Sequence, residues 1–247
     1  MGIRIPIGSR VLAVSWPMTL LTVAAVASFS ALGHWQWTKG TLRERQAEQF
    51  AHGSDVAQPI TGSLEKVPRF QRVRVKGMLD PAHQFLLDNR TNGGRPGYEV
   101  LTPLYFDAAE RDVILVNRGW IPFSGFRDKL PDISFAGNVE VEVTGRVDNL
   151  PAEGLASGHA APDKNAPWPK VTSYPTSMEL AQALPRPVEP RILLLDPGEP
   201  NGYVREWQPP GLTADRHWSY GVQWYAFAAL AVVLWIVLGI RRGRKID

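Results

Sequence analysis

The sequence predicts a membrane protein of the α+β class, with two transmembrane helices flanking an antiparallel, β-rich extramembrane domain that forms a barrel or a sandwich. Two runs, 11–38 and 218–240, contain 28 and 23 residues without Asp, Glu, Lys or Arg. Each run exceeds the roughly 20 residues that a helix needs to cross the hydrocarbon core of a bilayer. The segment between them carries most of the charge and shows the two-residue periodicity of β-strands.

This pattern divides the chain into five parts. They are a cytoplasmic tail (1–10), a first transmembrane helix (11–38), a periplasmic β-rich domain (39–216), a second transmembrane helix (217–240) and a basic cytoplasmic tail (241–247).

The orientation follows from the charges at the two ends. Arg4 and Arg10 precede the first run without any acid, and the last seven residues carry four basic residues against Asp247 alone. Short basic flanks stay in the cytoplasm, whereas long loops cross regardless of charge. The basic residues just past the first run are interleaved with Glu44 and Glu48, so they are the weaker signal. We therefore expect both termini to be cytoplasmic.

The membrane is expected to be a bacterial inner membrane, because ten residues before the first run leave no room for a mitochondrial presequence. A cleavable signal peptide is the alternative for the first run, since Ala25-Val-Ala27 resembles a cleavage site. The run continues to Trp35 and Trp37, however, and aromatic residues are typical of the membrane–water interface. This favours a permanent anchor in contact with the lipid bilayer.

The net charge of +3 does not indicate a nucleic-acid partner. The two tails contribute +5 and the remainder −2. A nucleic-acid-binding domain is expected to carry a basic stripe with interleaved aromatic residues, and the central segment has none.

The central segment contains about seven short strand patterns with turn signals between them. The expected strands are 71–76, 84–87, 98–102, 113–116, 139–143, 191–195 and 203–207. The polar residues 107–112 predict a hairpin, and residues 149–169 predict a long loop. Thr176 and Glu179 have capping-box spacing ahead of one short helix that stops at Pro185.

The central segment lacks recognisable catalytic motifs. It has no Gly-x-Ser-x-Gly elbow, no His-Glu-x-x-His and no cysteine nucleophile. His52, His83 and His159 are isolated in sequence and are interpreted as exposed loop histidines. Copper delivery needs thiolate or clustered Met and His ligands, and the chain has no Cys and four scattered Met. We therefore expect a protein that is not an enzyme.

The outer ends of the two uncharged runs are unusually polar and aromatic. Five residues of the second run share one helix face by their spacing: His217, Tyr220, Gly221, Trp224 and Ala228. This face offers a potential axial ligand, flat aromatic rings and a glycine where a planar ring could approach the backbone. His34 lies at a similar depth in the first run. The alternative is an aromatic belt with interfacial histidines, which is common in membrane proteins.

Five sequence blocks occur in order along the chain. They are Gly33-His-Trp-Gln36, Phe85-Leu-Leu-Asp-Asn-Arg90, Gly97-Tyr-Glu-Val-Leu-Thr-Pro-Leu104, Val116-Asn-Arg-Gly-Trp-Ile-Pro122 and His217-Trp-Ser-Tyr-Gly-Val-Gln-Trp224. Together with the two runs, they resemble the Surfeit locus protein 1 family of cytochrome c oxidase assembly factors.

The resemblance implies a protein that transiently binds haem a, or stabilises its insertion into oxidase subunit I. Subunit I is then the implied partner, with haem a synthase as a further candidate. His217 matches the histidine implicated in haem binding, which makes it the candidate ligand of the haem iron. Asp215-Arg216 and Lys39 depart from the family pattern and leave the hydrogen-bond partner of His217 open. His34 falls at a variable position of its motif.

Arg216 and Arg118 are candidate partners of anionic haem propionates, because a guanidinium binds a carboxylate through two parallel hydrogen bonds. For Arg118, a structural role in bonding backbone carbonyls is the alternative. Two other functions stay open at this point. They are a cofactor-free scaffold for oxidase subunits and a membrane-tethered periplasmic enzyme.

Overall fold

The computed structural model describes residues 2–7, 10–52, 56–106, 113–127, 129–135, 140–152, 158–209 and 211–242. The chain forms two compact units. Residues 1–49 together with 209–247 form a helical hairpin, and residues 50–208 form a β-rich unit.

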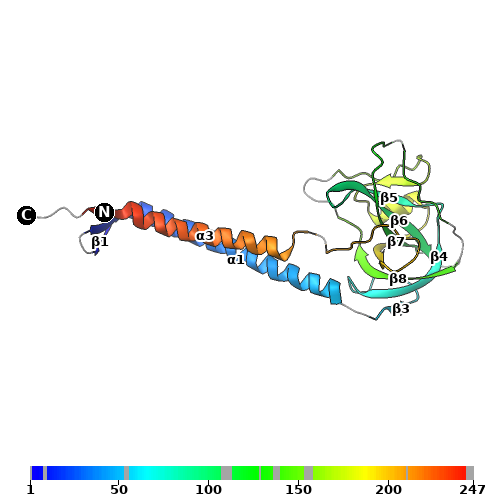
Figure 1. Cartoon of the computed structure of the whole chain (residues 1–247), viewed down its shortest axis with the longest axis horizontal. Helices are drawn as coiled ribbons and strands as arrows, with labels where there is room; N and C mark the ends of the chain where they lie inside the picture. Colours follow the sequence, from blue (N-terminus) through cyan, green and yellow to red (C-terminus); the bar gives the residue numbers. More distant parts are fainter. Residues whose placement is uncertain are drawn as a thin grey trace, which may run out of the picture. The chain divides into compact units, whose positions relative to one another are not determined.

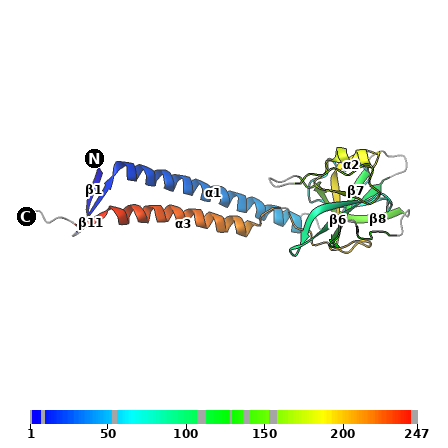
Figure 2. The same cartoon turned by 90° about the horizontal axis from the view of Figure 1, so that it is seen from above.

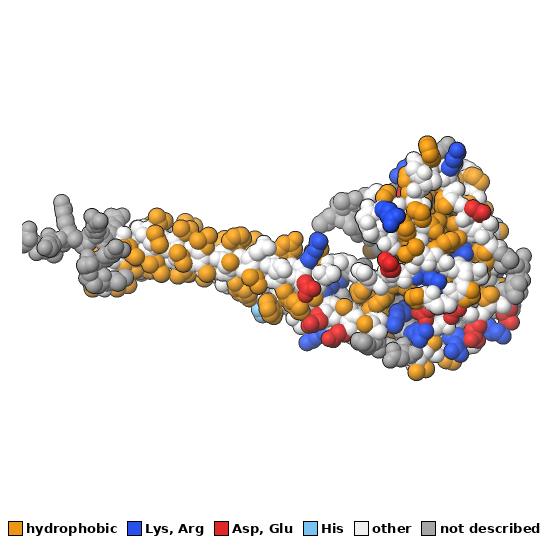
Figure 3. Space-filling view, in the orientation of Figure 1, with side chains coloured by type: hydrophobic (Ala, Val, Ile, Leu, Met, Phe, Trp, Pro, Cys, Tyr) orange, Lys and Arg blue, Asp and Glu red, His pale blue; other side chains and the backbone are white. Residues whose placement is uncertain are grey.

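The hairpin consists of helix α1 (Trp16–His52) and helix α3 (Ala214–Gly239), which lie side by side in both ribbon views (Figures 1 and 2). Both helices are long and apolar enough to cross a membrane. Only 6% and 11% of their most apolar windows are buried inside the molecule, unlike the core helices of a soluble protein. Hydrophobic side chains are accordingly the commonest coloured type along most of the visible surface of the two helices (Figure 3). The expected arrangement of two apolar helices flanking a β-rich domain is confirmed.

Helix α1 begins later than the uncharged run, at Trp16 rather than Val11. The backbone N–H of Met18 donates to Ser15 Oγ, and Pro17 fits only the first turn of a helix. Residues 11–15 instead belong to strand β2 (Arg10–Ser15), between β1 (Gly2–Ile7) and β11 (Ile240–Arg242) in a small antiparallel sheet.

Five strands of the β-rich unit close into a barrel, and several of them curve around one another in Figure 1. In order they are β4 (Arg72–Leu79), β8 (Glu140–Asn149), β10 (Val188–Leu195), β7 (Val113–Pro122) and β6 (Arg95–Tyr105). The ring closes where β4 pairs with β6, at Met78↔Tyr105 and Leu79↔Leu104. Gly77 allows this closure, because a side chain there would meet the Tyr105 carbonyl.

Three further strands extend the sheet beyond the barrel: β3 (Gln58–Ile60), β5 (Phe85–Asn92) and β9 (Lys170–Thr172). The one predicted helix is α2 (Ser177–Ala183). Its capping box is confirmed, since Glu179 N–H donates to Thr176 Oγ1 and Thr176 N–H donates to Glu179 Oε2.

The burial pattern follows the alternation that the sequence predicts. In β4, Val73 and Val75 are fully buried, while the neighbouring Arg74 and Lys76 are exposed. Strand β7 is buried almost throughout, because it lies between β6 and β10 near the middle of the sheet. Charged side chains therefore gather on the outside of this unit (Figure 3).

Six of the seven predicted strands are present. The prediction of a strand at 203–207 was wrong. This segment forms only an isolated bridge between Val204 and Trp120. The Arg205 guanidinium donates to the carbonyls of Tyr203, Asp196 and Glu199, so side-chain bonds hold the segment in place of a strand ladder.

Most neighbouring strands of the larger sheet are antiparallel, as the sequence predicts, and three pairs are exceptions. The pairs β7–β10, β3–β4 and β5–β9 are parallel. The antiparallel pairing of β6 with β7 agrees with the predicted hairpin, but its connection at 107–112 lies outside the described residues.

Candidate functional site

The two helices of the hairpin approach closely because small residues face aromatic rings across their seam. A Cβ added at Gly33 would lie 3.0 Å from the Tyr225 ring, and one added at Gly40 would collide with Trp218. Gly221 is buried, and a Cβ there would lie 3.4 Å from the Gly33 carbonyl oxygen. Small residues at such positions are typical of helix pairs in membranes, where backbones approach closely.

A polar pair joins the helices near the N-terminus of α3. His217 Nδ1 lies 2.8 Å from Oε1 of Gln36 on α1, and both side chains are half-buried. An amide oxygen can only accept a hydrogen bond, so Nδ1 carries the proton. Among the described residues, Nε2 has no hydrogen-bond partner. The second ring nitrogen therefore keeps its lone pair for a ligand.

An aromatic cluster lies seven residues further along each helix from this pair. Phe29 stacks on Trp224, with ring centroids 5.8 Å apart and planes inclined by 24°. Phe227 completes the cluster at 5.9 Å from Phe29 and 5.8 Å from Trp224. Seven residues correspond to roughly 10 Å along a helix. The cluster thus lies about two helical turns from the His217–Gln36 pair.

The predicted face of α3 is only partly available to a ligand. Tyr220, one turn from His217, and Phe227 are 41% and 46% exposed. Gly221 faces α1, and both Gly221 and Ala228 are buried. The proposal that a planar ring could approach the backbone at Gly221 does not fit this packing, because the backbone of α1 occupies that position. Exposed aromatic rings beside the seam are the alternative contact surface for a flat apolar molecule.

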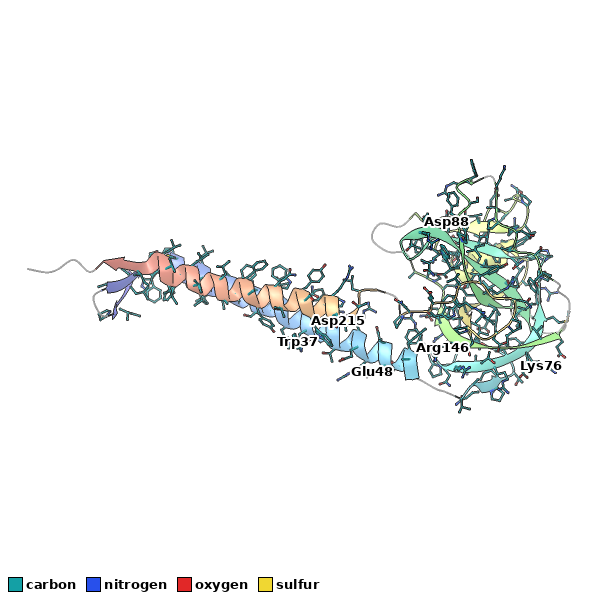
Figure 4. All side chains as sticks on the ribbon, in the orientation of Figure 1. Trp37, Glu48, Lys76, Asp88, Arg146 and Asp215 are labelled. Atoms are coloured by element: carbon teal, nitrogen blue, oxygen red, sulfur yellow. The ribbon has the colours of Figure 1, made fainter. Side chains whose placement is uncertain are left out.

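The structure does not bring His34 to His217. His34 is exposed on α1, whereas Gln36, two residues further on, makes the bond to His217. Residues two apart on a helix point to different sides. Arg216 lies next to His217 in the first turns of α3, which begin beside Asp215 (labelled in Figure 4), and its side chain is exposed.

Arg118 belongs to the β-rich unit and is 2% exposed. Its Nε donates to the Asn201 carbonyl at 2.7 Å, and its Nη1 donates to Gln84 Oε1 at 2.8 Å. The guanidinium lies over the rings of Phe135 and Tyr203, at 4.1 and 5.0 Å from their centroids. Burial lowers the pKa of Arg118. These contacts support the structural role that the sequence left open for this residue.

Comparison with known proteins identifies the family. The model of the SURF1 family matches residues 23–229, which is most of the chain. The chain belongs to the SURF1 family. A SURF1-like protein of Monosiga brevicollis is 27% identical over 189 residues, covering 71% of this chain and 69% of that protein. The family is generally linked to cytochrome oxidase assembly and is one of assembly factors rather than a known class of enzymes.

Sequence reasoning missed Gln36, Phe29 and Phe227 in this SURF1-family chain. Gln36 was visible as a polar residue at the end of the first uncharged run, but its pairing with His217 depends on the register of the two helices. That register is set by the glycine contacts of the seam, which no single helix reveals.

Two histidines of the β-rich unit are also less isolated than predicted. His83 Nδ1 lies 2.7 Å from Asp80 Oδ2, an i,i+3 pair whose carboxylate also accepts from the Tyr105 hydroxyl at 3.2 Å. His159 Nε2 lies 2.9 Å from Glu179 Oε1. The pKa of Tyr105 is raised to about 12, mainly by burial and secondly by the nearby charge of Asp80. Within the described ranges, no group of three His, Cys, Asp or Glu residues could hold a metal ion.

Proposed function

We propose that this SURF1-family chain is a membrane-anchored factor for cytochrome c oxidase assembly that transiently binds haem a, or stabilises its insertion into subunit I. The observation that carries the proposal is the bond from His217 Nδ1 to Gln36. It leaves Nε2 with a free lone pair, one helical turn from the exposed ring of Tyr220.

The residues around His217 fit a haem group. Haem iron takes a neutral imidazole as an axial ligand, and the polarity and burial around it tune its redox behaviour. His217 supplies the imidazole, while Tyr220, one turn away, and the Trp224–Phe227 pair, two or more turns away on α3, supply apolar surface. Arg216 is exposed and charged, so it can pair with a propionate. For Arg118 we propose a structural role instead, because its guanidinium is buried and bonded inside the β-rich unit.

The proposal assigns no bond-making step to the protein. His217 orients and holds the group, and the aromatic rings shield it from water. The partners we propose are subunit I of the oxidase and, as a source of haem a, haem a synthase. We further propose a bacterial inner membrane with both termini in the cytoplasm and residues 39–216 in the periplasm. The basic tails support this orientation.

The decisive experiment is the visible spectrum of the full chain purified from cells that make haem a. We expect a haem a spectrum in the parent protein and its loss or displacement in His217→Ala. Folding should be unchanged, because the half-buried imidazole contributes little packing. His34→Ala is the matched control and should leave the spectrum intact. Wild-type haem content in His217→Ala would refute the ligand assignment.

A cofactor-free scaffold is the second candidate function, and the exposed apolar surface of the hairpin favours it. A scaffold would co-purify with subunit I whether or not haem a is made, and His217→Ala would not reduce oxidase activity in cells. A haem carrier instead predicts that the variant lowers the fraction of oxidase with a complete haem–copper centre.

The orientation has its own test. Alkaline phosphatase fused within residues 149–169 should be active, and phosphatase fused after Lys245 should be inactive. Activity of the second fusion alone would reverse the proposed topology.

A further inference from the structure

We infer that Gln36 is a positioning residue. It holds His217 in the Nδ1-protonated tautomer and so directs the Nε2 lone pair away from α1 toward a ligand. The identity of that ligand as haem rests on the proposed function, but the tautomer does not. The inference concerns the apoprotein and can be tested without any cofactor.

The geometry of the pair carries the inference. The distance from His217 Nδ1 to Gln36 Oε1 is 2.8 Å, which is a well-formed hydrogen bond. In a neutral imidazole one nitrogen carries the proton and the other the lone pair, so the bond made by one nitrogen determines the state of the other. An acceptor at Nδ1 places the proton there and leaves Nε2 unprotonated.

The packing of the seam explains why the Gln36 side chain can reach the ring. A Cβ added at Gly221 would lie 3.7 Å from the Gln36 Cβ and 3.4 Å from the Gly33 carbonyl oxygen. The absence of a side chain at Gly221, four residues after His217, lets α1 approach at this level. The rings of Trp37 and Trp218, 6.1 Å apart, pack beside the pair; Trp37 is labelled on α1 in Figure 4.

The same bond raises the basicity of the ligand nitrogen. Histidines that bind metals commonly donate their other N–H to a carboxylate, a carbonyl or water, and removal of such a partner costs 10–100-fold in metal affinity. Gln36 supplies a neutral carbonyl for this purpose. A carboxylate in its place would accept more strongly, because hydrogen bonds to ionised groups are roughly twice as strong.

The first test uses the apoprotein with ¹⁵N-labelled histidine in lipid nanodiscs. We expect the ¹⁵N shifts of His217 in the parent to show a protonated Nδ1 and a bare Nε2. Gln36→Leu should lose this preference, whereas Gln36→Glu should retain it, since a carboxylate has only acceptors. Gln223→Leu is the matched control, because it removes an exposed amide of α3 that has no hydrogen-bond partner among the described residues.

The inference is overturned if His217 in the parent carries its proton on Nε2, or if Gln36→Leu leaves the Nδ1-protonated form unchanged. It is also overturned if Gln36→Glu loses the preference, because a carboxylate accepts more strongly than the amide and should keep the proton on Nδ1 at least as well.

The second test adds iron protoporphyrin IX to the same proteins. Gln36→Leu should bind it about 10–100-fold more weakly than the parent. Gln36→Glu should bind at least as tightly as the parent and lower the reduction potential of the iron. Absence of binding in every variant, with the expected tautomer in the apoprotein, would refute the proposed function and leave the positioning role intact. Equal affinity and potential in all variants would contradict the positioning role.

Discussion

The helical hairpin and the β-rich unit differ in how fully their polar side chains are hydrogen-bonded. In the β-rich unit, Lys170 is 3% exposed, and its ammonium donates to the carbonyls of Asp163, Lys164 and Ala166 at 2.6–3.0 Å. Arg118 is likewise bonded on several sides. In the hairpin, His217 uses one ring nitrogen and keeps the other free. The first arrangement stabilises a fold, and the second is available for binding.

The two units also differ in what stabilises them. The β-rich unit buries whole rows of aliphatic side chains, including Leu115, Val116 and Leu193 at 0% exposure. The hairpin buries little of its apolar surface and relies on a narrow seam of glycines and rings. Surface left apolar on this scale needs lipid or a partner to cover it. Core substitutions should therefore affect the β-rich unit, and seam substitutions the hairpin.

The largest effect is expected from an engineered disulfide across the seam between α1 and α3. The chain has no cysteine, and the Cβ–Cβ distance of 3.7 Å between positions 36 and 221 falls in the range of disulfides. Gln36→Cys/Gly221→Cys should cross-link almost completely under mild oxidation, as measured by mass spectrometry of the linked peptides. His34→Cys/Gly221→Cys should remain open, because His34 points elsewhere. Equal cross-linking of both pairs would show that the seam has a different register.

The core of the β-rich unit should be sensitive to Phe85→Ala. Phe85 is fully buried and packs edge-on against Trp168 at 5.1 Å. Loss of the ring should lower the free energy of unfolding by ~3–5 kcal/mol, measured by urea denaturation. Phe126→Ala is the control, since Phe126 is 63% exposed and should change stability by less than ~0.5 kcal/mol. Comparable losses in both variants would contradict the assigned core.

Arg118→Leu distinguishes a structural arginine from a propionate-binding one. The substitution leaves the Asn201 carbonyl without its Arg118 donor, which costs ~1–3 kcal/mol, whereas Gln84 Oε1 keeps the Thr102 hydroxyl as a donor. We expect a lower thermal midpoint but normal haem content in the folded fraction. Arg216→Leu should show the reverse, with unchanged melting and weaker haem binding. Loss of haem without loss of stability in Arg118→Leu would assign Arg118 to the site.

The smallest expected effect is the dependence of stability on pH that Asp80 contributes. Burial alone would raise the pKa of Asp80, but hydrogen bonds from His83, the Ala82 N–H and Tyr105 outweigh it and lower the pKa below its usual 3.8. Because the pKa of Asp80 is lower in the folded state, its ionised carboxylate stabilises the fold at pH values above the ordinary 3.8. This contribution disappears as the pH falls through the lowered pKa.

Asp80→Asn should therefore reduce stability at about pH 6 by under ~1 kcal/mol, because the His83 side chain is 45% exposed. The difference between variant and parent should vanish in acid. Denaturation curves at both pH values measure it. A difference that grows in acid would mean that the carboxylate is not stabilised in the folded state.

Local patterns predicted most of the fold. Val73 and Val75 alternate with charged residues, so one face of β4 had to be buried. The Thr176 and Glu179 spacing predicted the cap of α2, because a capping box involves only four consecutive residues. The segment 203–207 has the same local character as a strand, but Arg205 bonds three carbonyls there, and no local rule anticipates those contacts.

The candidate site was predicted only on one helix. Spacing placed His217, Tyr220 and Trp224 on one side of α3, and this holds for any regular helix. The same reasoning could not show that Gly221 faces α1 instead of a ligand, because burial depends on which helix lies alongside.

By itself, the sequence determined the two apolar helices, the β-rich character of the segment between them and the histidine at the start of α3. All of these follow from composition and period, which act over a few consecutive residues. Only the tertiary structure decided that β4 closes onto β6, that Arg118 is a buried structural residue and that Gln36 is the partner of His217. These contacts join residues 25 (Leu79 and Leu104) to 181 (Gln36 and His217) positions apart in the chain. They depend on the packing of whole elements, and short-range periodicity carries no information about it.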